Sequence, residues 1–97
     1  MLIAKSVQFS PLALNNLNEI IENVIAFTGY ELSGIKLSEA IFNKIESISY
    51  LPSAIGRKRD DNTREAFVRG YRIVYEEKED YIWIITIIHS SRLYPRS

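Results

Sequence analysis

The chain contains no cysteine and no long hydrophobic run, and these absences limit its class. Without cysteine, none of its 97 residues can form a disulfide, which fits a reducing compartment. Its longest apolar run, YIWIITII, is far shorter than the ~20 residues that a membrane-spanning helix needs. The N-terminal MLIAKSVQFSP has neither a long apolar core nor a small-residue cleavage site. We therefore expect a soluble cytoplasmic protein with no membrane contact, no metal and no cofactor.

An excess of charge of either sign is also absent. Twelve basic and 12 acidic residues give a net charge of zero, so the molecule has no overall field to attract nucleic acid. The charges are unevenly spread, because residues 1–50 contain 3 basic and 5 acidic residues, a charge of −2. Residues 57–72 contain 6 basic and 3 acidic residues, a charge of +3, and Arg92 and Arg96 follow. Taken alone, such a basic run is typical of a solvated loop.

Two amphipathic helices are predicted in the first half. Ser10 and Pro11 supply an N-cap followed by proline at the first helical position, and Gly29 is placed to end this helix. The second helix begins after a short connection between Gly29 and Gly34 and stops at Leu51-Pro52. Helices joined so briefly should form an antiparallel hairpin. Apolar positions at helical spacing give each helix a face to bury: Leu14, Leu17, Ile20, Ile21, Val24, Ile25 and Phe27, then Leu37, Ile41, Ile45 and Ile48.

Four segments have the alternation and composition of β-strands. LIAKSVQF precedes the first helix, and TREAFV, YRIVYE and YIWIITIIH follow the second, separated by short turn-like segments. The sequence therefore predicts a single α+β domain over residues 1–97. Its parts are an N-terminal strand, an antiparallel helix hairpin and a three-stranded antiparallel meander, with both helices on one face of the sheet.

Strand alternation assigns the meander's side chains to two faces. With simple turns and no bulge, Phe67 pairs with Arg72, and Arg72 with Ile85. One face is apolar and should lie on the helices: Ala66, Val68, Tyr71, Ile73, Tyr75, Ile82, Ile84 and Ile88. The other face mixes aromatic, aliphatic and charged groups: Glu65, Phe67, Arg72, Val74, Glu76, Tyr81, Trp83, Ile85, Ile87 and His89. No further helix is predicted to cover it, so it is a candidate interaction site.

The last strand ends in a histidine followed closely by an arginine. In this register Arg72 and His89 share the uncovered face, with Arg92 and Tyr94 a few residues away. Imidazole can exchange a proton near neutral pH and guanidinium can hold phosphate oxygens, so these four residues are a candidate catalytic site for phosphodiester chemistry. In the structural alternative, His89 bonds a backbone carbonyl at the strand end, and Arg92 pairs with an acid such as Glu65. The spacing alone leaves both open.

Three segments together resemble a known family. FSPLALNNLNEI, LPSAIGRKRDDNTREAFVRGYRIVYE and IIHSSRLYP, in the order strand, hairpin and meander, are similar to the RelE/ParE superfamily of bacterial toxins from type II toxin–antitoxin modules. The resemblance covers essentially the whole chain. Its most specific parts are Gly56-Arg57, the run GYRIVY and the terminal His89-x-x-Arg92.

The resemblance implies a small cytoplasmic toxin in a hetero-oligomer with an antitoxin. The antitoxin's flexible C-terminal segment would wrap the sheet and the helices. This agrees with the uncovered aromatic face, on which Phe67, Tyr81 and Trp83 are the expected antitoxin contacts.

Members of the superfamily differ in their target. RelE-like toxins are mRNA interferases that cut messenger RNA in the ribosomal A site, and there Arg72 and Arg92 would hold phosphate, near Tyr94. ParE-like toxins, of the plasmid-stabilization type, poison DNA gyrase and need no nuclease site, and the basic side chains expected to contact the target are Arg57, Arg59, Arg64 and Arg92.

We favour gyrase inhibition, because zero net charge suits dense RNA phosphate poorly and the hairpin and the His-x-x-Arg ending look more like ParE. A RelE-like endoribonuclease and an inactive toxin fold kept as a binding module remain as alternatives, so whether the chain is an enzyme stays open.

Overall fold

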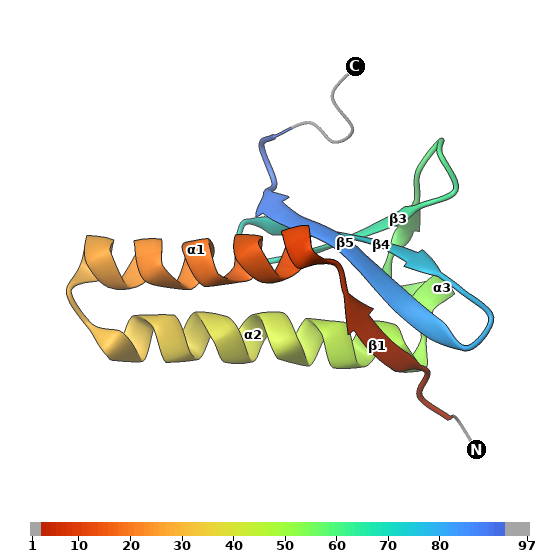
Figure 1. Ribbon diagram of the computed structural model, residues 1–97, viewed down its shortest axis with the longest axis horizontal. Coiled ribbons are helices and arrows are strands. Elements are labelled where there is room, and N and C mark those ends of the chain that lie inside the picture. The colour runs from red at the N-terminus through yellow and green to blue at the C-terminus, as the bar shows by residue number, and fades with distance from the viewer. Residues whose placement is uncertain (1–2, 93–97) are drawn as a thin grey trace.

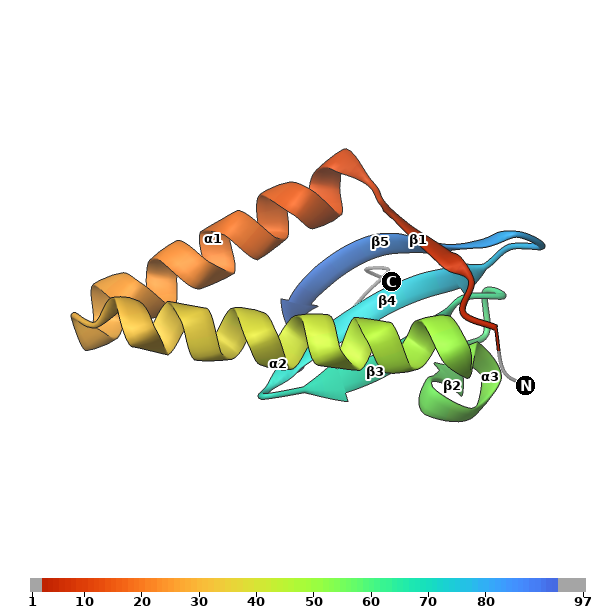
Figure 2. The same cartoon turned by 90° about the horizontal axis from the view of Figure 1, so that it is seen from below.

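The computed structural model describes residues 3–92 and consists of one mixed sheet with two long helices on one side (Figures 1 and 2). The strand order is β1-β5-β4-β3-β2, and every pair is antiparallel except β1–β5, which is parallel. The predicted α+β architecture is confirmed, while the parallel β1 and the short α3 and β2 were not predicted. The elements are β1 (Ser6–Phe9), α1 (Pro11–Thr28), α2 (Glu31–Tyr50), α3 (Pro52–Ile55), β2 (Arg57–Lys58), β3 (Arg64–Val68), β4 (Tyr71–Glu77) and β5 (Tyr81–His89).

The boundaries of α1 follow the predicted caps. Ser10 Oγ accepts the backbone N–H of Ala13 at 2.9 Å, which satisfies one of the free donors at the start of the helix. Gly29 ends the helix with φ +78, in the left-handed region that glycine adopts without strain. None of the helices within the described residues has the length and apolar composition needed to cross a membrane.

The hairpin is tighter than predicted, because α2 begins at Glu31 and includes Gly34. Gly34 is therefore not part of the connection. A Cβ at this position would lie 2.7 Å from Ile25 Cδ1 and 3.1 Å from Ile21 Cγ2. Glycine is disfavoured in a helix interior, but here it lets α1 and α2 approach closely.

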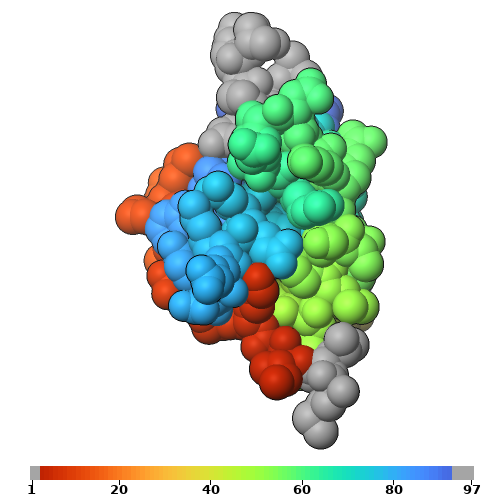
Figure 3. All heavy atoms as spheres, turned by 90° about the vertical axis from the view of Figure 1, so that its right-hand side faces the viewer, coloured from red at the N-terminus to blue at the C-terminus, as the bar shows by residue number. Residues whose placement is uncertain are grey.

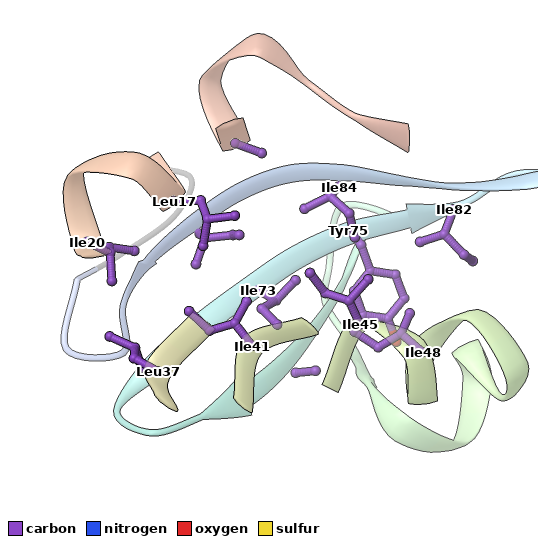
Figure 4. Close-up of a cluster of buried hydrophobic side chains, with 13 residues drawn as sticks. Leu17, Ile20, Leu37, Ile41, Ile45, Ile48, Ile73, Tyr75, Ile82 and Ile84 are labelled. Atoms are coloured by element: carbon purple, nitrogen blue, oxygen red, sulfur yellow. The ribbon is translucent and has the colours of Figure 1, made fainter. Parts of the chain in front are cut away.

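The core fills the space between the hairpin and the sheet (Figure 4). All four predicted positions of α2 are buried, whereas in α1 the buried residues are Ala13, Leu17 and Ile20. Leu14 and Phe27, predicted to be buried, are 49% and 91% exposed. The apolar positions of α1 span a wider arc than the sheet can cover, so those at its margins face solvent.

Tyr75 is the largest fully buried side chain of the core. Its hydroxyl donates to the carbonyl oxygen of Pro52 at 2.6 Å, and burial raises its pKa to about 12. A Cβ at Gly56 would lie 1.9 Å from the hydroxyl oxygen, so only glycine fits beside it. Tyr75 thereby positions the α3–β2 segment against the core.

The pairing of β4 with β5 differs from the prediction in two ways. Phe67 pairs with Arg72 as expected, but Arg72 pairs with Ile88 and not with Ile85. The partner of Tyr75 is Ile84, which lies two residues further along β5 than a simple turn predicts. A shift by an even number of residues leaves each side chain on its predicted face of the sheet. The pairing register shifts by one further residue between Val74 and Tyr75.

This one-residue shift is a bulge in β5 at Ile85, because Val74 pairs with Thr86 while Tyr75 pairs with Ile84. An odd shift reverses the alternation beyond it. Ile87, predicted on the uncovered face, is therefore in the core, and Ile88, predicted in the core, is not. His89 pairs with Tyr71, which packs against the core, so it too lies on the helix side of the sheet.

Side chains of α1 and of its N-cap residue bind the backbone of the bulge. The hydroxyl of Ser10 donates to the carbonyl oxygen of Ile85 at 2.6 Å. The side-chain oxygen of Asn16 accepts the N–H of Ile87 at 3.2 Å and the hydroxyl of Thr86 at 2.6 Å. Buried backbone groups freed by a bulge need such partners, so the bulge and the position of α1 depend on each other.

The assignment of the covered face predicts the effect of two substitutions. Ile73 and Ile84 are both fully buried, so Ile73→Asp and Ile84→Asp should each unfold the domain, because a buried unpaired carboxylate costs a large part of a stability of roughly 5–15 kcal/mol. Circular dichroism melting checks this. Ile35→Asp, at a residue that is 54% exposed, is the matched control and should melt close to the parent. A parent-like melt of either core variant would contradict the assignment.

Candidate functional site

The outer face, by which we mean the sheet face away from the helices, contains a cluster of arginines around Glu65. Register places the cluster: Arg57 of β2 lies opposite Glu65 of β3, and Phe67 of β3 lies opposite Arg72 of β4. Arg59 follows β2, where its backbone N–H donates to the carbonyl oxygen of Thr63 at 2.9 Å. We call Arg57, Arg59, Glu65, Phe67 and Arg72 the arginine cluster.

Glu65 makes ion pairs with all three guanidinium groups. Its Oε2 accepts from Arg57 Nε at 2.6 Å, and its Oε1 accepts from Arg59 Nη1 at 3.0 Å and lies 3.3 Å from Arg72 Nη1. The Glu65 side chain is 6% exposed, and those of Arg59 and Arg72 are 14% and 13% exposed, whereas that of Arg57 is 72% exposed. A carboxylate this deeply buried is tolerated because it is paired and hydrogen-bonded.

Opposing effects act on the pKa of Glu65. Burial removes the charged carboxylate from water and raises its pKa. Hydrogen bonds from Arg57 and Arg59 and the positive charge of Arg72 act in the other direction and prevail, so the pKa lies below its ordinary value. The carboxylate is therefore ionised at neutral pH, and the cluster carries three positive charges and one negative charge.

Phe67 lies between two of these arginines. The guanidinium carbons of Arg57 and Arg72 are 5.2 and 5.5 Å from the centre of its ring, within the range of a cation–π contact. Arg72 Nη2 also donates to the carbonyl oxygen of Ser90 at 2.6 Å. Phe67 remains 41% exposed, so the cluster presents an aromatic surface with a guanidinium on either side.

His89 lies away from this cluster, on the other face of the sheet. Its ring contacts the Tyr71 ring edge-on at 5.8 Å, and its Nδ1 accepts the N–H of Ser91 at 3.3 Å. The expectation that Arg72 and His89 share the uncovered face is therefore wrong. The cause is the bulge at Ile85, which reverses the side of every residue after it.

A small cavity lies beside His89, between α1 and the end of β5. It has a volume of about 240 Å³ and a mainly polar lining that includes Asn16, Glu19, Asn23, His89 and Arg92. Arg92 thus lines this cavity and is not an ion-pair partner of Glu65, whose partners are the three arginines of the cluster. In the structural alternative, His89 was expected to bond a carbonyl at the strand end, and the structure instead bonds it to a backbone N–H.

The other predicted site residues are more dispersed. Arg64 Nη1 donates to the carbonyl oxygens of Ser53 and Gly56, at 3.4 and 3.2 Å, and so ties β3 to the α3–β2 segment. Tyr94 lies outside the described residues. Tyr81 and Trp83 are on the outer face and partly buried. Phe67 pairs with Arg72 of β4, whereas Trp83 pairs with Glu76, which lies four residues further along the same strand. The three aromatic residues therefore do not form one patch.

Sequence reasoning missed an apolar surface on the hairpin. A groove of about 430 Å³ runs between α1 and α2, with a lining that includes Ile21, Ile25, Gly34 and Ile35. Large exposed apolar residues also lie around the connection between the two helices, at Phe27, Tyr30, Leu32 and Ile35. We call the groove and these residues the hairpin surface. The helical periodicity that could reveal it was assigned to the core, because periodicity does not show how wide the covering sheet is.

The described residues contain no group of three or more histidine, aspartate or glutamate side chains placed to hold a metal ion.

The N-terminal strand lies against the β4–β5 turn, as Figure 3 shows, where Lys5 Nζ donates to Glu77 Oε2 at 2.9 Å and to the carbonyl oxygen of Lys78 at 2.7 Å. This ion pair lies outside the arginine cluster.

Comparisons with known proteins identify the family from the sequence and support the fold from solved structures. The family described as the ParE toxin of the type II toxin–antitoxin system parDE matches residues 7–94. No curated protein matches the sequence. A chain in a structure of the chromosomal ParDE system from P. aeruginosa is similar to this chain with a TM-score of 0.78 and 16% identity, over 89% of this chain and 96% of that chain.

A second solved structure is the RelBE2 toxin–antitoxin complex from Mycobacterium tuberculosis. One of its chains is similar with a TM-score of 0.64 and 17% identity, over 90% of this chain and 99% of that chain. At such identities a structural likeness establishes the fold, and the function must be argued from the site.

The lowered pKa of Glu65 predicts how stability depends on pH. Because the folded-state pKa lies below the ordinary 4.5, the stabilisation by this carboxylate is complete above that pH and is lost as the pH falls through the folded-state value. Glu65→Gln should reduce the free energy of unfolding by roughly 1–3 kcal/mol at neutral pH. Urea titrations of both proteins at several pH values should show this difference shrinking below pH 4.5; a constant difference would contradict the ion-pair account.

Proposed function

This chain belongs to the ParE toxin family of type II toxin–antitoxin systems, and we propose that it is a toxin that inhibits DNA gyrase in the cytoplasm and is neutralised by a cognate antitoxin. The observation that carries the choice of target is the separation of Arg72 and His89 onto opposite faces of the sheet.

A nuclease mechanism would need these groups together. To cleave a phosphodiester, the proton-transferring group and the guanidinium must reach the same phosphate. Here Arg72 uses Nη1 on Glu65 and Nη2 on the carbonyl oxygen of Ser90, while His89 lies beside α1. A net charge of zero adds no attraction to ribosomal RNA. Both facts favour a protein target over an RNA substrate.

The four basic residues expected at the target interface differ in availability. Arg59 and Arg64 are occupied by Glu65 and by the carbonyl oxygens of Ser53 and Gly56. The side chain of Arg57 is 72% exposed, and Arg92 is also exposed. We propose that Arg57 and Arg92 contact gyrase directly and that Arg59 and Arg64 hold the surface in shape.

The antitoxin is proposed to cover apolar surface on both sides of the toxin. The solved neighbours come from a ParDE system and from a RelBE2 toxin–antitoxin complex, which supports a partner protein here. On the outer face the proposed contacts are Phe67, Tyr81 and Trp83, and on the other side the partner would fill the hairpin surface. Exposed aromatic and aliphatic anchors of this kind supply most of the affinity in protein interfaces.

Trp83 reports whether the antitoxin reaches the outer face. It is the only tryptophan, so binding there should shift its fluorescence emission. Phe67→Glu and Ile35→Glu place the same charge on the outer face and on the hairpin surface, and the ratio of their dissociation constants measures the share of each. If the emission is unchanged and only Ile35→Glu weakens binding, the antitoxin segment docks on the helices.

The target is tested with His89→Gln, which keeps hydrogen bonding but loses proton exchange. As a gyrase inhibitor the variant should remain toxic, with DNA damage and not loss of translation during growth arrest. A nuclease that uses His89 should lose on the order of a hundredfold in cleavage. The measurements are DNA cleavage complexes on purified gyrase and RNA cut sites on translating ribosomes, in the absence of antitoxin.

A folded His89→Gln variant that is not toxic would overturn the gyrase proposal and favour the nuclease. If the parent gives no signal in either assay, the chain is an inactive toxin fold that only binds a partner. Arg92→Ala is not informative, because it weakens both mechanisms.

A further inference from the structure

We propose that Glu65 is a specificity-determining residue: its carboxylate is an internal anion that occupies the arginine cluster and excludes nucleic-acid phosphates from the outer face. The inference rests on the proposed function only in that a gyrase inhibitor gains from not binding RNA. Its test measures RNA binding alone.

Without Glu65, the cluster has the chemistry of a single-strand binding surface. Three guanidinium groups converge within hydrogen-bonding distance of one point, the position of the carboxylate. Guanidinium matches the oxygens of a phosphate as well as those of a carboxylate. Phe67 adds a partly exposed ring between Arg57 and Arg72 on which a base could stack.

Glu65 reduces this capacity because its negative charge offsets one guanidinium charge and it draws one nitrogen of each arginine toward itself, Nε of Arg57, Nη1 of Arg59 and Nη1 of Arg72. Both of its oxygens are engaged, and they reach all three arginines. The carboxylate belongs to β3, between Arg57 on one neighbouring strand and the fully buried Val74 on the other. An incoming phosphate would have to displace an anion that is already in place and has no translational freedom to lose.

The burial of the cluster strengthens the effect. The Glu65 side chain is 6% exposed, so salt screens its interactions much less than it screens those of a phosphate arriving from solution. Only Arg57 keeps most of its surface in water. The wild-type outer face should therefore bind nucleic acid weakly and with a shallow dependence on salt.

The test compares Glu65→Gln with wild type for binding to a short fluorescent oligouridylate, by anisotropy at several salt concentrations. Glutamine keeps the size and removes the negative charge, so the three guanidinium charges are no longer offset and attract a phosphate at the surface of the cluster more strongly. We expect binding at least about tenfold tighter at low salt, with log K against log salt steeper by about 0.7 for each additional phosphate that the arginines neutralise.

Glu77→Gln is the matched control. It removes the same charge from an ion pair, that with Lys5 at 2.9 Å, which lies outside the arginine cluster. Both variants have the same net charge, so tighter binding limited to Glu65→Gln cannot come from charge in general. Adding Phe67→Leu to Glu65→Gln should remove part of the increase in affinity, because the aromatic ring is lost.

Three results would overturn the proposal: a folded Glu65→Gln that binds RNA no more tightly than Glu77→Gln, wild-type binding that is already tight and steeply salt-dependent, or an increase in affinity that does not change with the salt concentration. If Glu65→Gln fails to fold, Glu65→Asp replaces it. Aspartate keeps the charge but withdraws the carboxylate by one methylene, so it cannot reach all three arginines, and its RNA binding should rise above wild type. No rise would again overturn the proposal. Gyrase inhibition can fail or succeed independently of each outcome.

Discussion

The docking of α1 on the bulge of β5 is the interaction on which the rest of the structure depends. The bulge at Ile85 frees backbone groups in the middle of the sheet, and Ser10 and Asn16 of the α1 region bind them. These bonds place the helix over β5, and α2 follows because the short connection holds it antiparallel to α1. An unsatisfied buried backbone group would cost about as much as a lost hydrogen bond, so the strand irregularity and the helix position are stable only together.

The same irregularity separates the polar groups of the molecule into two sites. Before Ile85, the strands alternate regularly and bring Arg57, Glu65, Phe67 and Arg72 to the outer face. After Ile85, the alternation of side chains between the two faces is reversed, and His89 lies on the side of α1. A group that can exchange protons and the arginines that could hold a phosphate are therefore on opposite sides of the sheet. This separation supports the proposal that the target is a protein.

The arginine cluster shows how one carboxylate can decide what a basic surface recognises. Counting charges along the chain describes residues 57–72 as basic, yet in three dimensions Glu65 engages three of the basic groups at once. The basic side chains of this segment that remain exposed are those of Arg57, Lys58 and Arg69. A charged side chain that is already in an ion pair attracts a charged partner only weakly. The net charge of a segment is therefore a poor guide to what it binds.

The sequence by itself determined the two long helices and the strands β1, β3, β4 and β5, the cap of α1 at Ser10 and its end at Gly29, four buried positions of α2, and the side on which each residue of β3 and β4 lies. These features depend on local periodicity and on capping, which act within a few residues. Only the tertiary structure decided the bulge at Ile85, the side of His89, the three partners of Glu65 and the exposure of Phe27. Each of them depends on contacts between segments far apart in the chain: a bulge needs a helix to bind its backbone, a buried carboxylate needs cations from other strands, and an apolar stripe is covered only as far as the sheet extends.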